Sequence, residues 1–396
     1  METRQMKRFF LLIALLSLPW SAKSADRPVV SLLTCESGGE LYSTFGHSAL
    51  RVCYPATGQD LVFNFGLFDF GTPNFYWKFM RGKLQYMLGI QYMEDFMAQY
   101  RYEGRQVKEQ VLSLDSSQTS AIVERLQFLH LPANRYYYYS FLYKNCTSEL
   151  RDLIFPLVQA EVERFKGISA GVTDRDLIND YITGWTKFGI SLILGSGLDK
   201  EISVYQSMFL PQNLFRGIRS MDNGGKPMVE KEHVLYDSAT ESKKSSFAAV
   251  VVSPLFVLSL LLVGVLAGFF AKRFGKAFSN GYLVVISLLG VVLGGIILIT
   301  EHRELYMNYN LLWCNPLFGL VAIASFKGWK KTERMLSALS LVLLSILQLI
   351  WALDVQYAHP GFVVIVLTLA LIFLSRIFAR PAPKEPAQKQ MSSGSR

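Results

Sequence analysis

Cys146 is the residue of this 396-residue chain whose surroundings most suggest chemistry. It lies in LYKNCTSELRDL, residues 142–153, and the apolar residues that follow at helical spacing predict that it begins a helix. A cysteine in the first helical turn meets unpaired backbone N–H groups and the positive end of the helix dipole, which favour the nucleophilic thiolate. The alternative is a small side chain packed beneath the helix, because cysteine is among the residues most often buried.

A thiolate nucleophile needs a general base, and the chain has five histidines. Four of them lie in an expected linker, in loops between apolar segments, or at the end of a predicted helix. His47 instead follows Gly46 and enters the strand-like run SALRVCY, and the glycine allows another backbone or a substrate to approach. The next strand-like run, LVFNFG, offers Asn64 to orient the imidazole, with Asp60 and Asp69 as alternatives. Taken alone, a structural role explains His47 better.

The first residues of the chain indicate export. A basic segment, a short apolar run and small residues predict a signal peptide over residues 1–24, cleaved near Ser24 or Ala25, with an uncleaved anchor as the alternative. The exported part then holds three cysteines, an odd number. Cys35 and Cys53 flank a short segment with two glycines, which could turn the chain so that the two cysteines meet. A disulfide between them would leave Cys146 free. The alternative is that all three are reduced and buried, because pairing depends on Cα distance.

The C-terminal part of the chain is apolar enough for a membrane domain. Hydrophobic residues make up 51% of the chain and concentrate in five segments, which predict transmembrane helices at about 247–271, 281–300, 309–326, 336–353 and 361–378. Lys and Arg cluster after the first, third and fifth of these, so those sides are predicted to be cytoplasmic. An odd number of spans then places the N-terminal region outside the cytoplasm. The net charge of +9 is mostly explained by this topology, and no nucleic-acid partner is expected.

These signals divide the chain into five parts. A signal peptide (1–24) precedes a globular domain (26–218) and a polar linker (219–246), and a five-helix transmembrane domain (247–378) precedes a proline-rich tail (379–396) that is expected to be disordered. The predicted location is the bacterial inner membrane, with several passes and the N-terminal domain in the periplasm.

The N-terminal region resembles a known family. The ordered segments that carry the resemblance are YSTFGHSALRV, DLVFNFGLFDFGTPNFYWKFMRGKLQY, YEGRQVKEQ and YKNCTSELRDL. They are similar to the Lnb-type N-terminal periplasmic domain over residues 30–215. The resemblance implies the α+β fold of circularly permuted papain-like, NlpC-like thiol enzymes, in which the histidine strand precedes the cysteine helix. It also implies Cys146 as nucleophile and His47 as base, but it does not fix the third member, for which Asn64 is the candidate drawn from the neighbouring strand.

The resemblance further implies a reaction, lipoprotein N-acylation. A fatty acyl chain would pass from a phospholipid to the Cys146 thiol and then to the N-terminal amine of a lipoprotein, so phospholipids and lipoproteins are the expected partners. No cofactor is expected, and the sequence does not indicate an oligomeric state. Tyr42, Arg51 and Asn145, which lie within these motifs, are candidate substrate-binding residues, and Arg51 is suited to a phosphate headgroup.

Two other classes of function stay open at the level of sequence. The first is a thiol hydrolase of the same fold, which would cut amides in peptidoglycan peptides or esters in lipids, and the fold alone does not separate it from a transferase. The second is an envelope protein without enzymatic activity that binds a ligand. The presence of both His47 and Cys146 argues against this second class.

Overall fold

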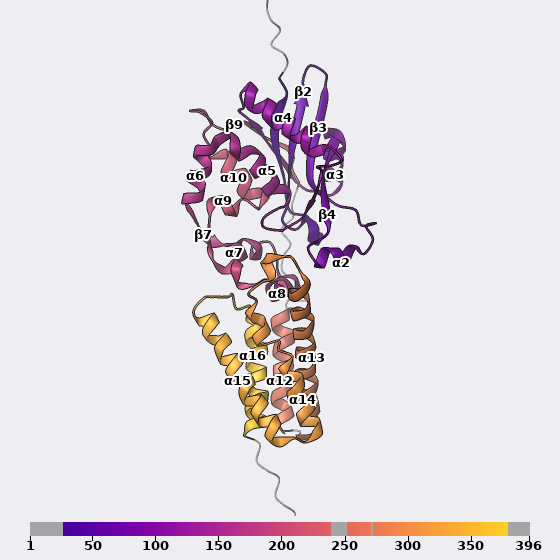
Figure 1. Cartoon of the computed structure of the whole chain (residues 1–396), viewed down its shortest axis with the longest axis vertical. Helices are drawn as coiled ribbons and strands as arrows, with labels where there is room; N and C mark the ends of the chain where they lie inside the picture. Colours follow the sequence, from indigo (N-terminus) through magenta and orange to yellow (C-terminus); the bar gives the residue numbers. More distant parts are fainter. Residues whose placement is uncertain (1–26, 239–251, 271, 379–396) are drawn as a thin grey trace, which may run out of the picture. The chain divides into compact units, whose positions relative to one another are not determined.

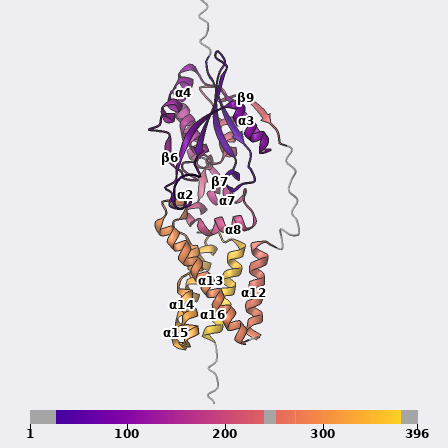
Figure 2. The same cartoon turned by 90° about the vertical axis from the view of Figure 1, so that its right-hand side faces the viewer.

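The computed structural model describes residues 27–238, 252–270 and 272–378. The chain forms two compact units, and each consists of two stretches of sequence. Unit 1 lies within Met1–Gly171 and Ile202–Glu241, and unit 2 lies within Val172–Glu201 and Ser242–Arg396. Figures 1 and 2 show a sheet with helices packed on it in unit 1 and a bundle of helices in unit 2. The predicted signal peptide and C-terminal tail lie outside the described residues.

Unit 1 is built on a seven-stranded sheet of order β6-β4-β3-β2-β1-β5-β9, in which every neighbouring pair is antiparallel. The strands are β1 (Val29–Cys35), β2 (His47–Tyr54), β3 (Gln59–Leu67), β4 (Gln85–Tyr92), β5 (Val107–Leu112), β6 (Tyr136–Tyr138) and β9 (Val229–Tyr236). A separate two-stranded sheet contains β7 (Ser169–Thr173) and β8 (Glu201–Ser203).

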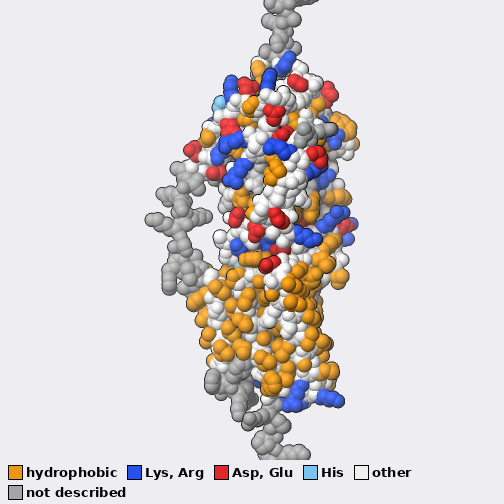
Figure 3. Space-filling view, turned by 90° about the vertical axis from the view of Figure 1, so that its left-hand side faces the viewer, with side chains coloured by type: hydrophobic (Ala, Val, Ile, Leu, Met, Phe, Trp, Pro, Cys, Tyr) orange, Lys and Arg blue, Asp and Glu red, His pale blue; other side chains and the backbone are white. Residues whose placement is uncertain are grey.

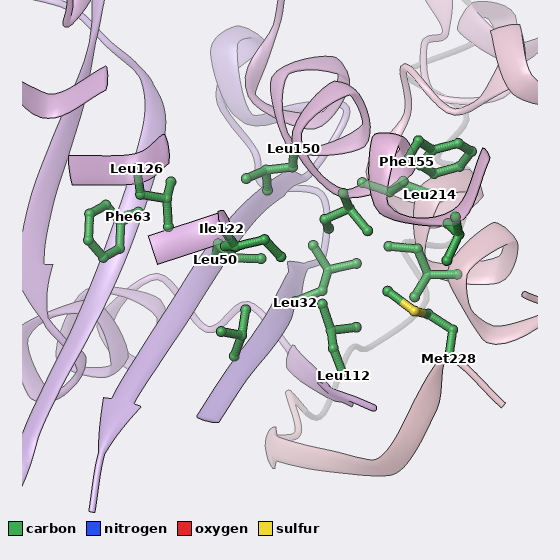
Figure 4. Close-up of a cluster of buried hydrophobic side chains, with 14 of the residues drawn as sticks. Leu32, Leu50, Phe63, Leu112, Ile122, Leu126, Leu150, Phe155, Leu214 and Met228 are labelled. Carbon is green, nitrogen blue, oxygen red and sulfur yellow. The ribbon is translucent and has the colours of Figure 1, made fainter. Parts of the chain in front are cut away.

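Helices cover both faces of this sheet because its central strands bury apolar side chains on each face. Leu32, Leu50 and Phe63 pack on one face, where they meet Leu150 of α5, among other helical side chains (Figure 4). The opposite face packs against α3. Unit 1 contains η1 (Leu41–Ser43), α2 (Phe75–Met80), α3 (Met93–Tyr102), α4 (Ser116–His130), α5 (Cys146–Ile154), η2 (Phe155–Val158), α6 (Gln159–Gly167), α9 (Val204–Ser207) and α10 (Pro211–Arg219).

The structure corrects the predicted linker at 219–246. Its residues 229–236 form β9, an edge strand that pairs with β5. Glu232 on this strand accepts a hydrogen bond from Gln110 Nε2 at 2.7 Å and forms an ion pair with Arg219. Edge strands often carry charged side chains, which discourage pairing with other chains. The polarity that suggested a linker is therefore the polarity of an exposed edge.

Unit 2 contains four helical segments long and apolar enough to cross a membrane: Gly275–Ile299, Tyr309–Lys327, Lys330–Ala352 and Pro360–Ile377. Hydrophobic side chains cover the bundle surface seen in Figure 3, and Lys and Arg gather at one end. A fifth apolar helix, α12, is shorter. The helices are α7 (Asp174–Asn179), α8 (Gly184–Ile193), η3 (Ser196–Asp199), α12 (Pro254–Phe270), α13 (Lys272–Ile299), η4 (Arg303–Leu305), η5 (Tyr309–Leu312), α14 (Leu317–Lys327), α15 (Lys330–Ala352) and α16 (Pro360–Ile377).

One segment of the expected globular domain, Val172–Glu201, belongs to unit 2. Backbone and side-chain hydrogen bonds hold it to the loop that follows α13: Gly195 N–H donates to Glu304 O at 2.8 Å, and Asn308 Nδ2 donates to Leu192 O at 2.8 Å. The approach is so close that a Cβ at Gly195 would lie 1.7 Å from the carbonyl oxygen of Tyr306. These bonds join residues more than 100 positions apart, so no local sequence pattern predicts them.

Candidate active site

Cys146 is the first residue of α5, and Asn145 caps that helix. The Asn145 Oδ1 atom accepts the backbone N–H groups of Thr147 and Ser148, each at 2.8 Å. Its Nδ2 atom donates to the carbonyl oxygens of Phe141 and Phe209 at 2.7 and 3.0 Å. Asn145 is buried, and all of its amide groups already have hydrogen-bond partners. Its role is therefore to cap the helix, and it is not available for the substrate contact that the sequence predicted. The Cys146 N–H is the first-turn donor that this cap leaves unused.

His47 begins β2, and the glycine before it is required by the backbone. Gly46 has φ +81°, and a Cβ there would lie 2.6 Å from the carbonyl oxygen of Cys35. The neighbouring strand β3 brings Asn64 beside the imidazole, and His47 Nε2 lies 3.1 Å from Asn64 Oδ1. Asn64 is buried, so it holds the ring in one orientation. With Nε2 engaged by Asn64, Nδ1 is the nitrogen available to a thiol.

The two aspartates considered as alternatives to Asn64 have other partners. Asp60 accepts two hydrogen bonds from Arg51, at 2.8 Å to Nε and 2.6 Å to Nη2. Asp69 accepts the backbone N–H of Gly71 at 2.7 Å, which closes a turn. Asn64 is therefore the residue that the fold brings to His47.

The Cys146 thiol and the His47 imidazole lie close enough for each to change the pKa of the other. Burial raises the pKa of Cys146, but the charge and hydrogen bond of His47, together with the Ser48 N–H and the Thr147 hydroxyl, outweigh burial and lower it to about 7. Burial lowers the pKa of His47, whereas the Cys146 charge and hydrogen bond and the Asn64 hydrogen bond raise it above its usual value. Both shifts favour a thiolate beside an imidazolium.

Tyr137 supplies a hydroxyl at the same site. A Cβ on Gly66 would lie 3.7 Å from Cys146 Cβ and 3.9 Å from Tyr137 Oη, so both groups adjoin this glycine, whose φ is +92°. The Tyr137 hydroxyl is buried beside the Gly66 N–H, and its proton has no hydrogen-bond acceptor among the described residues. Burial and the negative charge of Cys146 raise the pKa of Tyr137 well above its usual value, so the hydroxyl keeps its proton.

Sequence reasoning missed Tyr137, and the available signal was partial. It is one of four successive tyrosines, and strand alternation alone implies that two point away from the solvent. The structure exposes Tyr136 and Tyr138 and partly buries Tyr137 and Tyr139. The pattern therefore narrows the choice to a pair, but only the fold identifies the tyrosine that reaches Gly66.

Two predicted substrate-binding residues lie elsewhere. Arg51 is occupied by Asp60 and, through Nη1, by Glu109 at 2.8 Å, so its guanidinium is part of a structural ion-pair network rather than a phosphate site. Tyr42 is 69% exposed in η1. Within the described part of the chain, no hydrogen bond links Tyr42 to Cys146 or His47.

The predicted disulfide is wrong, because β1 and β2 pair as antiparallel neighbours. Cys35 lies opposite His47, whereas Cys53 lies opposite Val29 at the other end of the pair. Six residues of strand separate the two positions by roughly 20 Å, far beyond the roughly 7 Å limit between disulfide-bonded Cα atoms. All four cysteines are free thiols. Burial raises the pKa of Cys35 to about 12, so this thiol stays protonated where Cys146 does not.

The arrangement suits covalent acyl chemistry. It offers a polarised thiol, an oriented imidazole, and two donors, the Cys146 N–H and the Tyr137 O–H, that donate to no other group among the described residues. These are the parts required to attack a carbonyl and hold the charge that develops on its oxygen. Within residues 27–238, 252–270 and 272–378, no group of three or more His, Cys, Asp or Glu side chains is placed to hold a metal ion.

These features define a class of protein: a sheet-based domain with a cysteine–histidine pair is followed by a helical membrane region. Residues 19–170 match the Lnb N-terminal periplasmic domain, and residues 242–380 match the Lnb transmembrane domain. The chain belongs to the Lnb family and is a membrane-anchored protein with a periplasmic N-terminal domain, which confirms the family and the α+β and helical architecture predicted above. No curated protein and no solved structure matches the chain.

Proposed function

We propose that this protein is a thiol acyltransferase of the bacterial inner membrane, which moves a fatty acyl chain from a phospholipid to the N-terminal amine of a lipoprotein. The observation that carries the proposal is the Cys146–His47–Asn64 arrangement in a periplasmic domain of a membrane-anchored protein. The helical domain keeps the enzyme in the plane where both substrates reside. That five helices cross the membrane is also part of this proposal.

In the first half-reaction, the Cys146 thiolate attacks the carbonyl carbon of a phospholipid ester. The negative charge moves to the carbonyl oxygen, where the Cys146 N–H and the Tyr137 hydroxyl donate to it. As the tetrahedral intermediate collapses, the ester C–O bond breaks and the His47 imidazolium gives its proton to the departing alcohol. The products are a lysophospholipid and an acyl thioester on Cys146.

In the second half-reaction, the lipoprotein amine attacks the thioester carbonyl. His47, now neutral, takes a proton from the amine while the C–S bond breaks, so an amide forms and the thiolate–imidazolium pair returns. Asn64 keeps the imidazole in the same orientation through both steps. The same two donors serve the second oxyanion, because the carbonyl oxygen occupies the same place.

The hydrolase alternative shares the first half-reaction and differs only in the second, where water replaces the amine. A purified full-length protein incubated with acyl-labelled phospholipid and a lipopeptide with a free N-terminal amine separates the two. We expect the label in the lipopeptide amide, measured by mass spectrometry, and no transfer with a lipopeptide whose amine is acetylated. Release of labelled free fatty acid at the same rate with either peptide would instead make the protein a hydrolase.

The corresponding test in cells compares lipoprotein N-termini with and without the gene. The proposal expects the N-acylated form to disappear on deletion and to return with the wild-type chain but not with Cys146→Ala. Unchanged N-acylation after deletion would contradict the proposal.

A further inference from the structure

Residues 67–83, which comprise the last residue of β3 and nearly all of its connection to β4, expose an unusual number of aromatic side chains. It contains α2, the helix FYWKFM, in which no residue is buried even though five of the six are apolar or aromatic. Phe70, Tyr76 and Trp77 are 64%, 80% and 50% exposed. Figure 1 shows α2 on this connection. An exposed aromatic group of this kind, rimmed by polar residues, indicates a contact surface.

The exposed rings belong to an ordered cluster. Phe70 lies 4.9 Å from Phe68 and 5.0 Å from Phe75, measured between ring centroids. Phe68 in turn contacts Tyr86 of β4 at 5.1 Å, and Tyr86 stacks on Tyr139 at 4.4 Å. The inner side of the cluster is therefore fixed to the sheet, and its outer side is a preformed aromatic surface.

The charges in this segment identify what it contacts. Lys78 and Arg81 provide positive charge, and the carboxylate of Asp69 is engaged by the Gly71 N–H. Aromatic residues, Met and Arg are enriched in the cores of protein–protein interfaces, whereas Lys is depleted there. Trp and Tyr combined with Lys and Arg are instead the residues that anchor proteins at a membrane–water interface. The chemistry thus favours a lipid surface over a protein partner.

We propose that residues 67–83 bind the periplasmic interface of the bilayer. Phe70, Tyr76 and Trp77 enter the region of the lipid ester groups, and Lys78 and Arg81 face the lipid phosphates. The occupant is available at all times, because the same chain is anchored in the membrane by its helical domain. Binding needs no encounter in solution, only contact with the bilayer in which the protein resides.

This surface also adjoins the thiol in the chain. Gly66, where an added Cβ would lie 3.7 Å from Cys146 Cβ, is followed directly by Leu67, the first residue of the segment. A segment seated among lipid ester groups therefore leads straight to the nucleophile that attacks such an ester, and this part of the inference rests on the proposed function. We infer that the segment presents a bilayer phospholipid to Cys146.

Fluorescence of Trp77 tests the binding. The sequence contains six tryptophans, so the difference between the emission of the protein in nanodiscs and that of its Trp77→Phe variant isolates Trp77. Phospholipids brominated near the ester end of the acyl chain quench a tryptophan that lies among them. We expect them to remove most of this difference emission. A difference emission equal in brominated and ordinary lipids would overturn the proposal.

The second test separates lipid delivery from the chemistry. Phe70→Ser/Trp77→Ser is compared with Tyr102→Ser, a control that removes an aromatic side chain 93% exposed at the end of α3. Acylation of Cys146 is measured with two donors, a bilayer phospholipid and a short-chain, water-soluble thioester. We expect the double variant to lose about tenfold or more with the bilayer donor, because docking raises the local donor concentration. Its rate with the soluble donor stays unchanged, and the control matches wild type with both.

The outcomes are distinguishable. Loss of both activities in the double variant would show that the segment supports the site itself, which contradicts lipid delivery. If wild-type Cys146 is acylated by neither donor, the proposed function fails, while quenching of Trp77 still decides whether the segment binds the bilayer.

Discussion

Each unit of this protein has a cluster of buried polar groups, and the two clusters use their hydrogen-bonding capacity in opposite ways. In unit 2, Arg376 donates to Glu333 at 2.5 Å, to Asn280 at 2.8 Å, and also to Ser325. In unit 1, the Cys146–His47 pair lies beside the Tyr137 hydroxyl, whose proton has no acceptor in the described part of the chain. Saturated groups hold elements together, whereas unused donors beside a polarised thiol are available to a substrate.

The saturated cluster spans the bundle. Asn280, Ser325, Glu333 and Arg376 belong to α13, α14, α15 and α16, so one guanidinium joins four helices. Arg51 in unit 1 follows the same rule, since Asp60 and Glu109 occupy it. The lesson is that a buried charge indicates function only when part of its environment is left unsatisfied.

The largest expected effect is the loss of the thiol. Cys146→Ala should lower acyl transfer by about 10⁴-fold or more, because it removes the atom that carries the acyl group. His47→Ala should fail in the same range, and the double variant should be scarcely worse, since nucleophile and base act as one unit. Transfer is measured by mass spectrometry of the acylated lipopeptide. Near-normal transfer by a destabilised Cys146→Ala protein would mean that this cysteine is only a packed core residue.

The next effect concerns stability. Arg376→Ala leaves the buried Glu333 carboxylate with only Lys330, at 3.5 Å, as its ion-pair partner, which should cost at most about 3–5 kcal/mol of unfolding free energy. Lys331→Ala, an exposed charge in the same helix as Glu333, is the control and should change little. Denaturation in detergent measures both. Acylation of Cys146 by a soluble thioester should persist in Arg376→Ala, and its loss would contradict the division between a structural and a catalytic cluster.

Removal of the unused hydroxyl should produce a smaller loss. Tyr137→Phe should reduce kcat/KM by roughly 10- to 100-fold, less than a full oxyanion-hole loss because the Cys146 N–H remains. The neighbouring Tyr138→Phe, whose ring is 57% exposed, serves as the matched control and should be neutral. Folding is checked by thermal unfolding. A Tyr137→Phe protein with wild-type kinetics would remove this hydroxyl from the mechanism.

The smallest expected effect is on the pH dependence of Cys146 reactivity, which tests its electrostatic coupling to His47. The pKa of Cys146 is lowered to about 7, so its thiolate form is present above that pH and its alkylation rate should fall as the pH drops below about 7. In His47→Ala the main stabilising charge is gone, so the midpoint should move to higher pH. Iodoacetamide labelling followed by peptide mapping measures this, with Cys35, whose pKa is raised to about 12, as the slow internal reference. Equal midpoints in both proteins would contradict the coupling.

Local sequence signals predicted the reactive residues because the chemistry depends on short stretches. Cys146 at the start of a helix and His47 after a glycine each follow from the few residues around them. Asn64 was selected from three candidates by its place in the next strand, and the fold brings it to His47. The pairing of these residues could be anticipated only through the family resemblance, since 99 positions separate His47 from Cys146.

The register of the strands could not be predicted from the sequence. Cys35 and Cys53 look ready to pair when read along the chain, but antiparallel pairing places them at opposite ends of β1 and β2. Register depends on which residues of both strands reach the core together, which is a property of the packed sheet. The same holds for β9, whose polar residues form a strand because β5 offers an unpaired edge.

By itself, the sequence determined the presence of a mixed N-terminal region and of apolar helices, the start of the cysteine helix, and the glycine before the histidine, because each depends on local composition, periodicity or backbone freedom. The tertiary structure placed Val172–Glu201 in unit 2. Only the tertiary structure decided which polar groups were used up. Arg51 and Asn145 lost their predicted substrate roles to neighbours distant in sequence or to the cap, and Tyr137 gained a place beside Cys146. Hydrogen-bond saturation is set by all the groups that converge on a point in space, and these come from separate parts of the chain.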